Sequence, residues 1–415
     1  MAPETQTKSE QTVEVSRTAL QAVRQALIDL YEVVGADPET PQEVARRFSI
    51  NRNLTWKLSR VISAADPAAA LAHLPGNSGM ELAIEAFAKH GAPGEAVGGV
   101  REAMRRLDEV VREHAGDRGT FAVMLGGSSP APDQKQGEAS RKMFYQGASA
   151  IWGVQARVHV SLHFVSPSLK GEDKLDLAVV AGFVDFRRLR PDVSWAVASM
   201  ATFVDDGTPQ EHPDIGPLDA AVRRGEAPLL RQFCSSPVPE LRRTQRPGAS
   251  VTRYELTEGP VGNAAAATCM LGWAARGEVN RYRADGDHFG EHIVRLSTPV
   301  EVVYHELFVH RSLGFAMRPT VHLYSDLPGG PQFQFDGKDR GVLPVAEEVQ
   351  DLGESPPNTA NAEIPNYRRL VDTAVAGLGR ELNEFHGFRF KMKYPPIPAQ
   401  LLYRYELPER PLTGR

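Results

Sequence analysis

The chain has 415 residues, of which 41% are hydrophobic and 24% are charged, and its formal net charge is −5. This length predicts two or three domains, and the composition is typical of a globular protein. The weakly acidic balance excludes nucleic-acid binding through the overall charge of the molecule. Any such binding has to come from a local basic patch.

Features that would place the chain outside the cell or in a membrane are missing from the sequence. Its two cysteines, Cys234 and Cys269, are too few for a disulfide framework or a zinc site, and we expect both to be reduced. The polar first residues lack the apolar core of a signal peptide. The sequence contains no run of about 18 apolar residues, so no membrane span is predicted. The sequence therefore predicts a cytoplasmic protein of bacterial type, and we expect no cofactor.

The N-terminal part of the chain has the apolar spacing of amphipathic helices. Residues 1–15 are polar and are predicted to form a disordered tail. Between Ser16 and Val34, apolar residues recur three and four positions apart, which predicts a helix. Further helices are predicted over residues 67–71, from Ser78 onward and over 93–114. Residues 16–125 are therefore predicted to form an all-helical domain.

Two short helices are predicted between residues 40 and 62. Thr40 can cap the first of them, with Pro41 at its first position, where a missing N–H has no consequence. Glu43 follows Thr40 by three residues and completes a capping box. The apolar residues of this helix, Val44, Ala45 and Phe48, fall on one face.

The break between the two helices lies at Ser49 and Ile50, and Asn51 can cap the second helix. Ile50 is placed to fill the inside of the corner. Glycine is favoured where a tight turn needs a positive φ, so this turn has to form with the less suitable Ser49. The second helix has an apolar side made of Leu54, Thr55, Leu58, Val61 and Ile62.

The opposite side of the second helix is polar and basic. Its exposed residues are predicted to be Asn51, Arg52, Asn53, Trp56, Lys57 and Arg60. In a major groove, Asn can bind adenine and Arg can bind guanine through two hydrogen bonds each. Lys57 and Arg60, together with Arg46 and Arg47 on the preceding helix, can bind phosphates.

This pattern resembles the helix-turn-helix of DNA-binding transcription regulators, over about residues 16–62. In that family the second helix enters the major groove with its N-terminal residues against the base edges. The chain departs from the family at Ser49, where Gly is usual, and at Thr55, where Val or Ile is usual. The resemblance implies a sequence-specific regulator whose partner is double-stranded DNA, acting as a homodimer on two half-sites or as a higher homo-oligomer.

The second part of the chain has sequence patterns that are typical of β-strands. Residues 126–140, rich in Gly, Ser, Pro and charge, are predicted to be a linker. Strands are predicted over 154–165, 175–186, 195–204, 250–257, 292–310 with a break at Pro299, 318–325, 387–394 and 400–407. Helices are predicted over 217–234 and 366–385, and long loops over 325–343 and 350–365. Residues 141–415 therefore predict an α+β domain with a largely antiparallel sheet, for dimerisation, sensing or assembly.

Histidine pairs in this part do not predict a metal centre. His305 and His310 are five residues apart, so on a strand they point to opposite faces and do not fit the zinc-protease pattern. His159 and His163 share a strand face with Ser161, which is typical of the solvated side of a sheet.

The densest group of ligand-like residues surrounds His288 and His292, four positions apart in DGDHFGEHIV. Asp285, Asp287 and Glu291 accompany them. We interpret the group as a polar loop leading into a strand, so no metal is expected. Of all residues in the sequence, His288 and His292 come closest to a pair of metal ligands.

Two other functions stay open for residues 141–415. This part can hold the activity of an enzyme or a small-ligand-binding protein, or build a multimeric scaffold. The sequence has neither a phosphate-binding loop with a Gly-Lys pair nor a Gly-x-Ser-x-Gly elbow. DNA-binding regulation is therefore the prediction that the residues favour, with a small molecule or a protein as possible effector.

Overall fold

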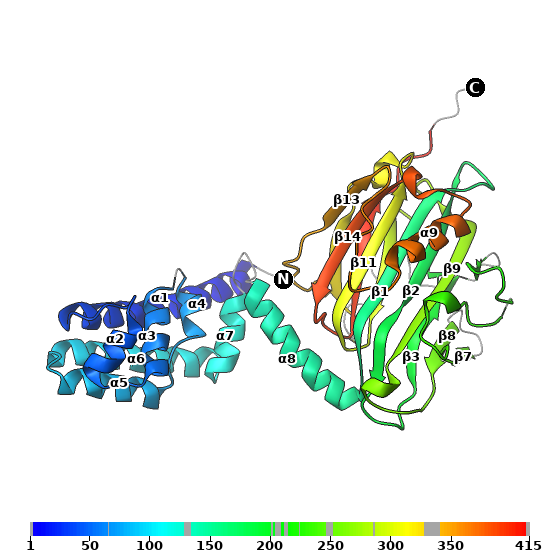
Figure 1. Cartoon of the computed structure of the whole chain (residues 1–415). Helices are drawn as coiled ribbons and strands as arrows, with labels where there is room; N and C mark the ends of the chain where they lie inside the picture. The colour runs from blue at the N-terminus through cyan, green and yellow to red at the C-terminus, as the bar shows by residue number, and fades with distance from the viewer. Residues whose placement is uncertain are drawn as a thin grey trace. The chain divides into compact units, whose positions relative to one another are not determined.

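The computed structural model divides into two compact units, residues 1–132 and 133–415, each considered by itself (Figure 1). The boundary falls inside the segment 126–140 that the composition marks. The structure describes residues 3–64, 66–127, 134–200, 202–203, 209–210, 215–223, 225–245, 252–284, 287–327 and 341–411. Among these residues, no helix combines the length and the apolar character that a membrane crossing requires.

The described part of the first unit is helical. Its helices are α1 (Pro3–Val33), α2 (Pro41–Phe48), α3 (Arg52–Ile62), α4 (Pro67–Leu71), α5 (Asn77–Lys89), α6 (Gly94–His114) and α7 (Arg118–Gly127). Residues 3–15, predicted to be a disordered tail, belong to α1. The reason is that no Gly or Pro interrupts the chain between Pro3 and Gly35, and Val13 already packs against the core.

The core of the first unit is built around α1, which packs along α6. Leu20, Val23, Leu27 and Leu30 of α1 are buried against apolar residues of the other helices. Three aromatic rings tie α1, α2 and α5 together: Phe87 lies 5.4 Å from Tyr31 and 4.7 Å from Phe48, between ring centroids. The apolar spacing of the sequence therefore identified the faces that become buried.

The turn between α2 and α3 has the strain that its sequence predicts. Ser49 takes a left-handed conformation, with φ 57° and ψ 37°, and its N–H donates to the carbonyl of Ala45. The side-chain oxygen of Asn51 accepts from the backbone N–H of Asn53 at 2.8 Å, as a cap of α3. The predicted capping box at Thr40 is wrong, because the Thr40 hydroxyl is turned back toward Asp37 and makes no capping hydrogen bond to α2.

The second unit begins with α8 (Gln134–Trp152) and is dominated by a seven-stranded sheet, in the order β13-β14-β11-β1-β2-β9-β6. Helix α8 thus includes residues 134–140 of the predicted linker. The strands of the sheet are β1 (Val154–Pro167), β2 (Lys174–Arg188), β6 (Ile215–Pro217), β9 (Ala267–Asn280), β11 (Val300–His310), β13 (Gln350–Glu354) and β14 (Phe385–Lys393). Pairing is antiparallel except between β1 and β11. A mixed α+β class with mainly antiparallel pairing is therefore confirmed.

Both faces of the central strands are covered. Helix α9 (Tyr367–Gly377) lies on one face (Figure 1) and packs Leu370 and Val371 against apolar side chains of the sheet. On the other face, a three-stranded sheet in the order β10-β15-β12 packs against β1, β11 and β14. Its strands are β10 (Phe289–Leu296), β12 (Thr320–Ser325) and β15 (Ala399–Glu406). The predicted break at Pro299 separates β10 from β11.

Smaller elements complete the second unit. A second three-stranded sheet has the order β3-β8-β7, and a short pair joins β4 and β5. These elements are β3 (Trp195–Met200), β4 (Thr202–Phe203), β5 (Pro209–Gln210), β7 (Leu241–Gln245) and β8 (Thr252–Leu256), with single turns η1 (Arg231–Phe233), η2 (Asn263–Ala265), η3 (Gly314–Ala316) and η4 (Leu382–Glu384).

Several predicted elements of the second unit are wrong. The described part of the predicted helix 217–234 contains only the turn η1, because Gly225 at φ 96° and Pro228 interrupt it. Helix α9 ends at Gly377, whereas the prediction ran to 385. Strand β13 occupies part of the predicted loop 350–365. Most of the predicted loop 325–343 lies outside the described residues.

Strand β9 is absent from the sequence prediction, since its Ala- and Gly-rich residues carry little β propensity. The neighbouring strand β2 provides the reason that it forms. Gly182 of β2 lies so close to β9 that a Cβ there would be 2.0 Å from the carbonyl oxygen of Cys269. The fit between the two backbones, which local propensity does not report, sets this pairing.

Replacing Ser49 tests the strain in the α2–α3 turn. We expect Ser49→Gly to raise the free energy of unfolding of the first unit by about 0.5–1 kcal/mol, because removing Cβ relieves a left-handed strain of about 1–2 kcal/mol, part of which is offset by the greater freedom of glycine in the unfolded chain. Urea unfolding followed by far-UV circular dichroism measures the difference. Ser49→Ala is the control and should not stabilise. A glycine variant that unfolds at lower urea than the wild type would contradict the assignment.

Candidate nucleic-acid interface and buried polar sites

The outer side of α3 carries most of the residues predicted to contact DNA. Arg52, Asn53, Trp56 and Arg60 are exposed, and Lys57 is half-buried. Arg46 is exposed on α2. The side chains of Arg46, Arg52 and Lys57 make no hydrogen bond or ion pair to the part of the chain that the structure describes. These three cations are therefore available to an external anion.

Arg47, predicted to bind phosphate, has a different role. Its guanidinium donates to two carbonyl oxygens at the end of α1, those of Gly35 at 2.6 Å and Val34 at 2.9 Å. It also lies 4.8 Å from the centre of the Phe48 ring. The last carbonyls of a helix lack partners within the helix and attract cations. Arg47 satisfies them, so we remove it from the predicted interface.

Asn51 is also committed within the fold. Its side-chain oxygen caps α3, which leaves the amide NH₂ as its free group. A bidentate contact with adenine needs the oxygen and the NH₂ together. Asn51 therefore does not fit the predicted base contact while the cap is intact, and Arg52 and Asn53 become the N-terminal residues of α3 that can reach a base edge.

Trp56 is predicted to be exposed on the side of the second helix that faces DNA, and the structure shows it partly covered by other side chains. Its ring meets the ring of His73 edge-on, with 5.4 Å between centroids. The Arg60 guanidinium lies 5.5 Å from the Trp56 ring centre. Trp56 is still 42% exposed. Trp56 and Arg60 therefore form a partly exposed surface on α3, made of an aromatic ring and a cation.

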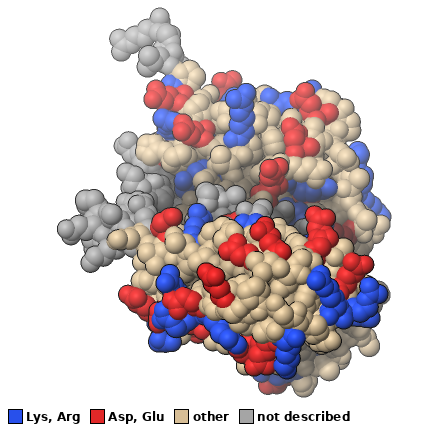
Figure 2. All heavy atoms as spheres, turned by 90° about the vertical axis from the view of Figure 1, so that its left-hand side faces the viewer, with Lys and Arg blue, Asp and Glu red and all other residues tan. Residues whose placement is uncertain are grey.

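Two hydrogen bonds hold α3 in place beneath this surface. The Ser59 hydroxyl donates to the carbonyl of Pro38 at 2.5 Å, and Arg24 of α1 donates to the carbonyl of Ile62 at 2.9 Å. On the face of the molecule that Figure 2 shows, Lys and Arg are interspersed with Asp and Glu. This mixture agrees with the net charge of −5, and no basic character of the whole chain supports DNA binding.

The second unit encloses a cluster of histidines between its two packed sheets. His159, Ser161 and His163 of β1, predicted to lie on a solvated face, are buried because the sheet β10-β15-β12 covers them. The Ser161 hydroxyl lies 3.2 Å from Nε2 of His163 and 3.2 Å from Nδ1 of His305. Nε2 of His305 donates to the carbonyl of His292 at 2.8 Å.

The four imidazoles are held neutral. Burial lowers the pKa of His159 to about 3, that of His292 to about 3 and that of His305 to about 4. Burial also places the pKa of His163 well below its usual value. The charge that His305 would carry adds to the effect on each of the other three. These imidazoles are buried with few hydrogen-bond partners, so protonating one of them would destabilise the folded protein.

The candidate group around His288 and His292 does not converge on a point. His292 is buried and hydrogen-bonds through Nε2 to the Tyr405 hydroxyl at 3.0 Å, whereas His288 is exposed. Asp287 accepts from Asn280, and Glu291 is paired with Arg404. Asp285 lies outside the described residues. Within the described ranges, no three His, Cys, Asp or Glu side chains are arranged as metal ligands.

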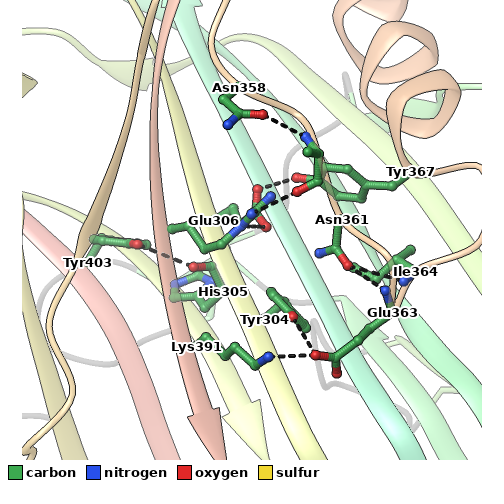
Figure 3. A network of polar contacts seen from close by, with 12 residues as sticks. Tyr304, His305, Glu306, Asn358, Asn361, Glu363, Ile364, Tyr367, Lys391 and Tyr403 are labelled. Carbon is green, nitrogen blue, oxygen red and sulfur yellow. Dashed lines mark hydrogen bonds and ion pairs between the residues drawn. The ribbon is translucent and has the colours of Figure 1, made fainter.

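A buried ion pair on the α9 side of the sheet escaped the sequence analysis (Figure 3). Glu306 of β11 is fully buried and accepts from Nε of Arg389 at 2.7 Å and from the Tyr367 hydroxyl. Burial raises the pKa of the Glu306 carboxyl, while the Arg389 guanidinium and the Tyr367 hydroxyl oppose that shift. In this strand the sequence drew attention to His305 and His310, which do not fit a metal site, and it gave no signal for Glu306.

The loop before α9 is fastened to this ion pair and to a second one beside it. Arg389 Nη1 donates to the carbonyl of Ala360 at 3.0 Å, and Glu363 accepts from Tyr304 at 3.0 Å and from Lys391 at 2.5 Å. Figure 3 shows the loop folded by Asn358 and Asn361, whose side-chain oxygens accept from backbone N–H groups two and three residues ahead. The network positions a loop against the sheet.

Comparisons with known proteins give no family for the chain. No family model matches it, and no curated protein does. Among solved structures it is similar to a chain from Parabacteroides distasonis provisionally described as a protease, with 8% sequence identity and a TM-score of 0.25. That alignment covers 61% of this chain and 40% of the other. A likeness this distant carries no argument about function.

The histidine cluster predicts how the second unit responds to acid. In the unfolded chain each imidazole takes up a proton below its usual pKa of about 6.5, whereas the folded protein resists protonation until about pH 3–4. The unfolded state then binds more protons, so we expect the free energy of unfolding to fall as the pH drops from about 6.5 toward 4. Urea titrations at several pH values, followed by near-UV circular dichroism, give the slope.

His159→Phe is the matched variant for this measurement, because the His159 ring stacks on Phe183 with 4.5 Å between centroids and a phenyl ring can replace it. The variant should take up about one proton fewer on unfolding in this range. Equal slopes for the two proteins would show that His159 is not protected from protonation.

The ion pair of Glu306 predicts a large effect of removing its cation. We expect Arg389→Met to lower the free energy of unfolding by about 3–5 kcal/mol, because the Glu306 carboxylate is left buried without a cationic partner. The double variant Glu306→Gln/Arg389→Met should recover part of that loss, since the unpaired charge is gone. Denaturant unfolding of the three proteins measures both differences. A double variant that is less stable than the single one would contradict the assignment.

Proposed function

We propose that the first unit binds double-stranded DNA through a helix-turn-helix made by α2 and α3, and that the chain is a sequence-specific transcription regulator. The observation that carries the proposal is the free side of α3, where Arg52, Asn53 and Lys57 are not used by the fold. Arg46 on α2 extends the same basic character. Exposed cations next to exposed amides match the mixture of phosphate and base contacts that a major-groove reader makes.

The roles within the proposed interface follow from position and chemistry. Arg52 and Asn53, in the first turn of α3, are assigned to base edges, since the N-terminal end of the second helix enters the groove in this family. Lys57, Arg46 and Arg60 are assigned to phosphates. Arg47 and Asn51 support the interface from behind, by holding the end of α1 and the start of α3.

A single pair of helices makes few base contacts, so we propose that the chain binds as a dimer on two half-sites. The second unit would supply the dimer contact or respond to an effector, since the first unit needs a partner copy to reach a useful affinity. A regulator of this kind would work in the cytoplasm, where bacterial DNA lies. Protection of two half-sites about 10–10.5 base pairs apart, or a multiple of that, is the footprint expected of such a dimer.

Selection of binding sites from a random DNA pool tests the proposal. We expect the wild-type chain to enrich one motif and the double variant Arg52→Ala/Lys57→Ala to lose that enrichment, with an affinity reduced roughly tenfold or more, because base and phosphate contacts disappear together. Arg46→Ala should weaken binding to all sequences alike and lower the slope of log affinity against log salt by about one.

Arg112→Ala is the control, since Arg112 is an exposed cation of α6 in the same unit and its loss removes one positive charge, as Arg46→Ala does. It should leave the motif and the affinity near those of the wild type. Helical content of each variant, from circular dichroism, checks that α2 and α3 still fold. Binding that enriches no motif, or that falls as much in Arg112→Ala as in the double variant, would refute the proposal.

A further inference from the structure

The two cysteines of the chain meet in the second unit, although they are far apart in the sequence. Cys234 follows the turn η1, and Cys269 lies in β9. The segment before and after Cys234 runs beside β9: Leu230 N donates to the carbonyl of Met270 at 2.9 Å, and Ser235 N donates to that of Thr268 at 2.9 Å. These bonds, and a contact of the Cys234 sulfur with the Met270 N–H at 3.5 Å, place Cys234 next to Cys269.

The two thiols differ in access and in acidity. Cys269 is fully buried, whereas Cys234 is half-buried and open to a small reagent. The Cys269 thiol, together with the Met270 N–H at 3.5 Å and the nearby charge of Arg231, lowers the pKa of Cys234 to about 7, against the effect of burial. The carbonyls of Leu230 and Met270 accept from Cys234 in its thiol form, at 3.5 and 3.7 Å. The hydrogen bond to Cys234 and burial both raise the pKa of Cys269.

We propose that Cys234 and Cys269 form an oxidisable dithiol site, in which the half-buried Cys234 reacts with a hydroperoxide and the buried Cys269 then closes an intramolecular disulfide. The inference is independent of DNA binding by the first unit. Reactive cysteines combine an accessible, stabilised thiolate with a second thiol close enough to resolve the first product. Here the segment 229–235 and β9 provide both, since Cys234 lies beside β9 and its sulfur contacts the backbone of Met270, the residue next to Cys269.

The chemistry needs no group beyond the peroxide. The Cys234 thiolate attacks one peroxide oxygen, so that an S–O bond forms and the O–O bond breaks. The hydroxide or alkoxide that leaves takes up a proton. Cys269 then attacks the sulfenic sulfur of Cys234, so that the S–S bond forms and the S–O bond breaks. The proton of Cys269 goes to the departing hydroxide, which leaves as water. The two sulfurs lose two electrons in total, and the peroxide gains them.

Stoichiometry of the whole wild-type chain provides the first test, and it requires no variant. With one equivalent of the aromatic disulfide DTNB, Cys234 should form a mixed disulfide and release one thiolate. Cys269 should then displace the second thiolate and close the internal bond. We therefore expect two released thiolates per DTNB consumed and no reagent left on the protein. Release of one thiolate, with the reagent retained on Cys234 by mass spectrometry, would overturn the proposal.

Hydrogen peroxide tests the oxidation itself. Because the chain has two cysteines, an internal disulfide can join only Cys234 and Cys269. After treatment with a few equivalents of peroxide, differential alkylation should show both thiols lost together and both restored by dithiothreitol. Covalent dimers on a non-reducing gel, or a sulfinic acid at Cys234 with Cys269 still free, would overturn the proposal.

Single variants assign the two roles. In Cys269→Ala, peroxide should leave a sulfenic acid at Cys234 that dimedone traps, because the resolving thiol is gone. In Cys234→Ser, the buried Cys269 should react at least tenfold more slowly than Cys234 does in the wild type. Equal reactivity of the two cysteines, or no trapped sulfenic acid, would contradict the roles. Thermal unfolding of the reduced variants checks that each is folded, and the wild-type stoichiometry decides if one is not.

Discussion

Burial of both faces of the central strands is the constraint on which the second unit depends. Strands β1 and β11 lie in the middle of the seven-stranded sheet, with α9 on one side and a second sheet on the other. Every polar side chain on these strands must then find a partner inside the protein or lose its charge. His305 and Glu306, adjacent in the sequence, meet this demand in opposite ways. The first stays neutral among other histidines, and the second is paired with Arg389 on β14.

In the first unit too, polar backbone groups need partners inside the protein. This need decides which polar side chains are used by the fold and which stay free to bind an external ligand. The ends of α1 and α3 leave backbone groups without partners, and Arg47, Asn51 and Arg24 satisfy them. Two of them, Arg47 and Asn51, belong to the basic and amide-rich region that resembles a DNA reader, and sequence alone does not distinguish them from Arg52 or Lys57. The proposed interface therefore consists of what remains after the helix ends have taken their partners, which makes it smaller than the sequence pattern indicates.

The sequence predicted the elements whose signal is local. Apolar spacing placed α2, α3 and α6, alternation placed β1, and the strained turn was expected because Ser49 stands where the helix-turn-helix family usually has Gly. It failed where the reason for a structure lies in another segment. Strand β9 exists because β2 presents a glycine to its backbone, and the pair Glu306–Arg389 arises because the β11–β14 register sets these residues opposite each other. Neither register nor approach between distant segments can be read from the spacing of residues along one of them.

A polar group that has a partner inside the fold usually has a structural role, and the cysteine pair is an exception to this rule. Cys234 and Cys269 satisfy each other, as the histidines around Ser161 do, and composition alone indicates two inert, reduced thiols. The difference is that the neighbouring thiol lowers the pKa of Cys234, and the segment that holds Cys234 runs along β9 next to Cys269. Mutual satisfaction then prepares the pair for a bond, because the same contact that stabilises the reduced site lines up the two atoms that oxidation joins. For a cysteine, a neighbouring thiol inside the fold therefore makes oxidation to a disulfide possible.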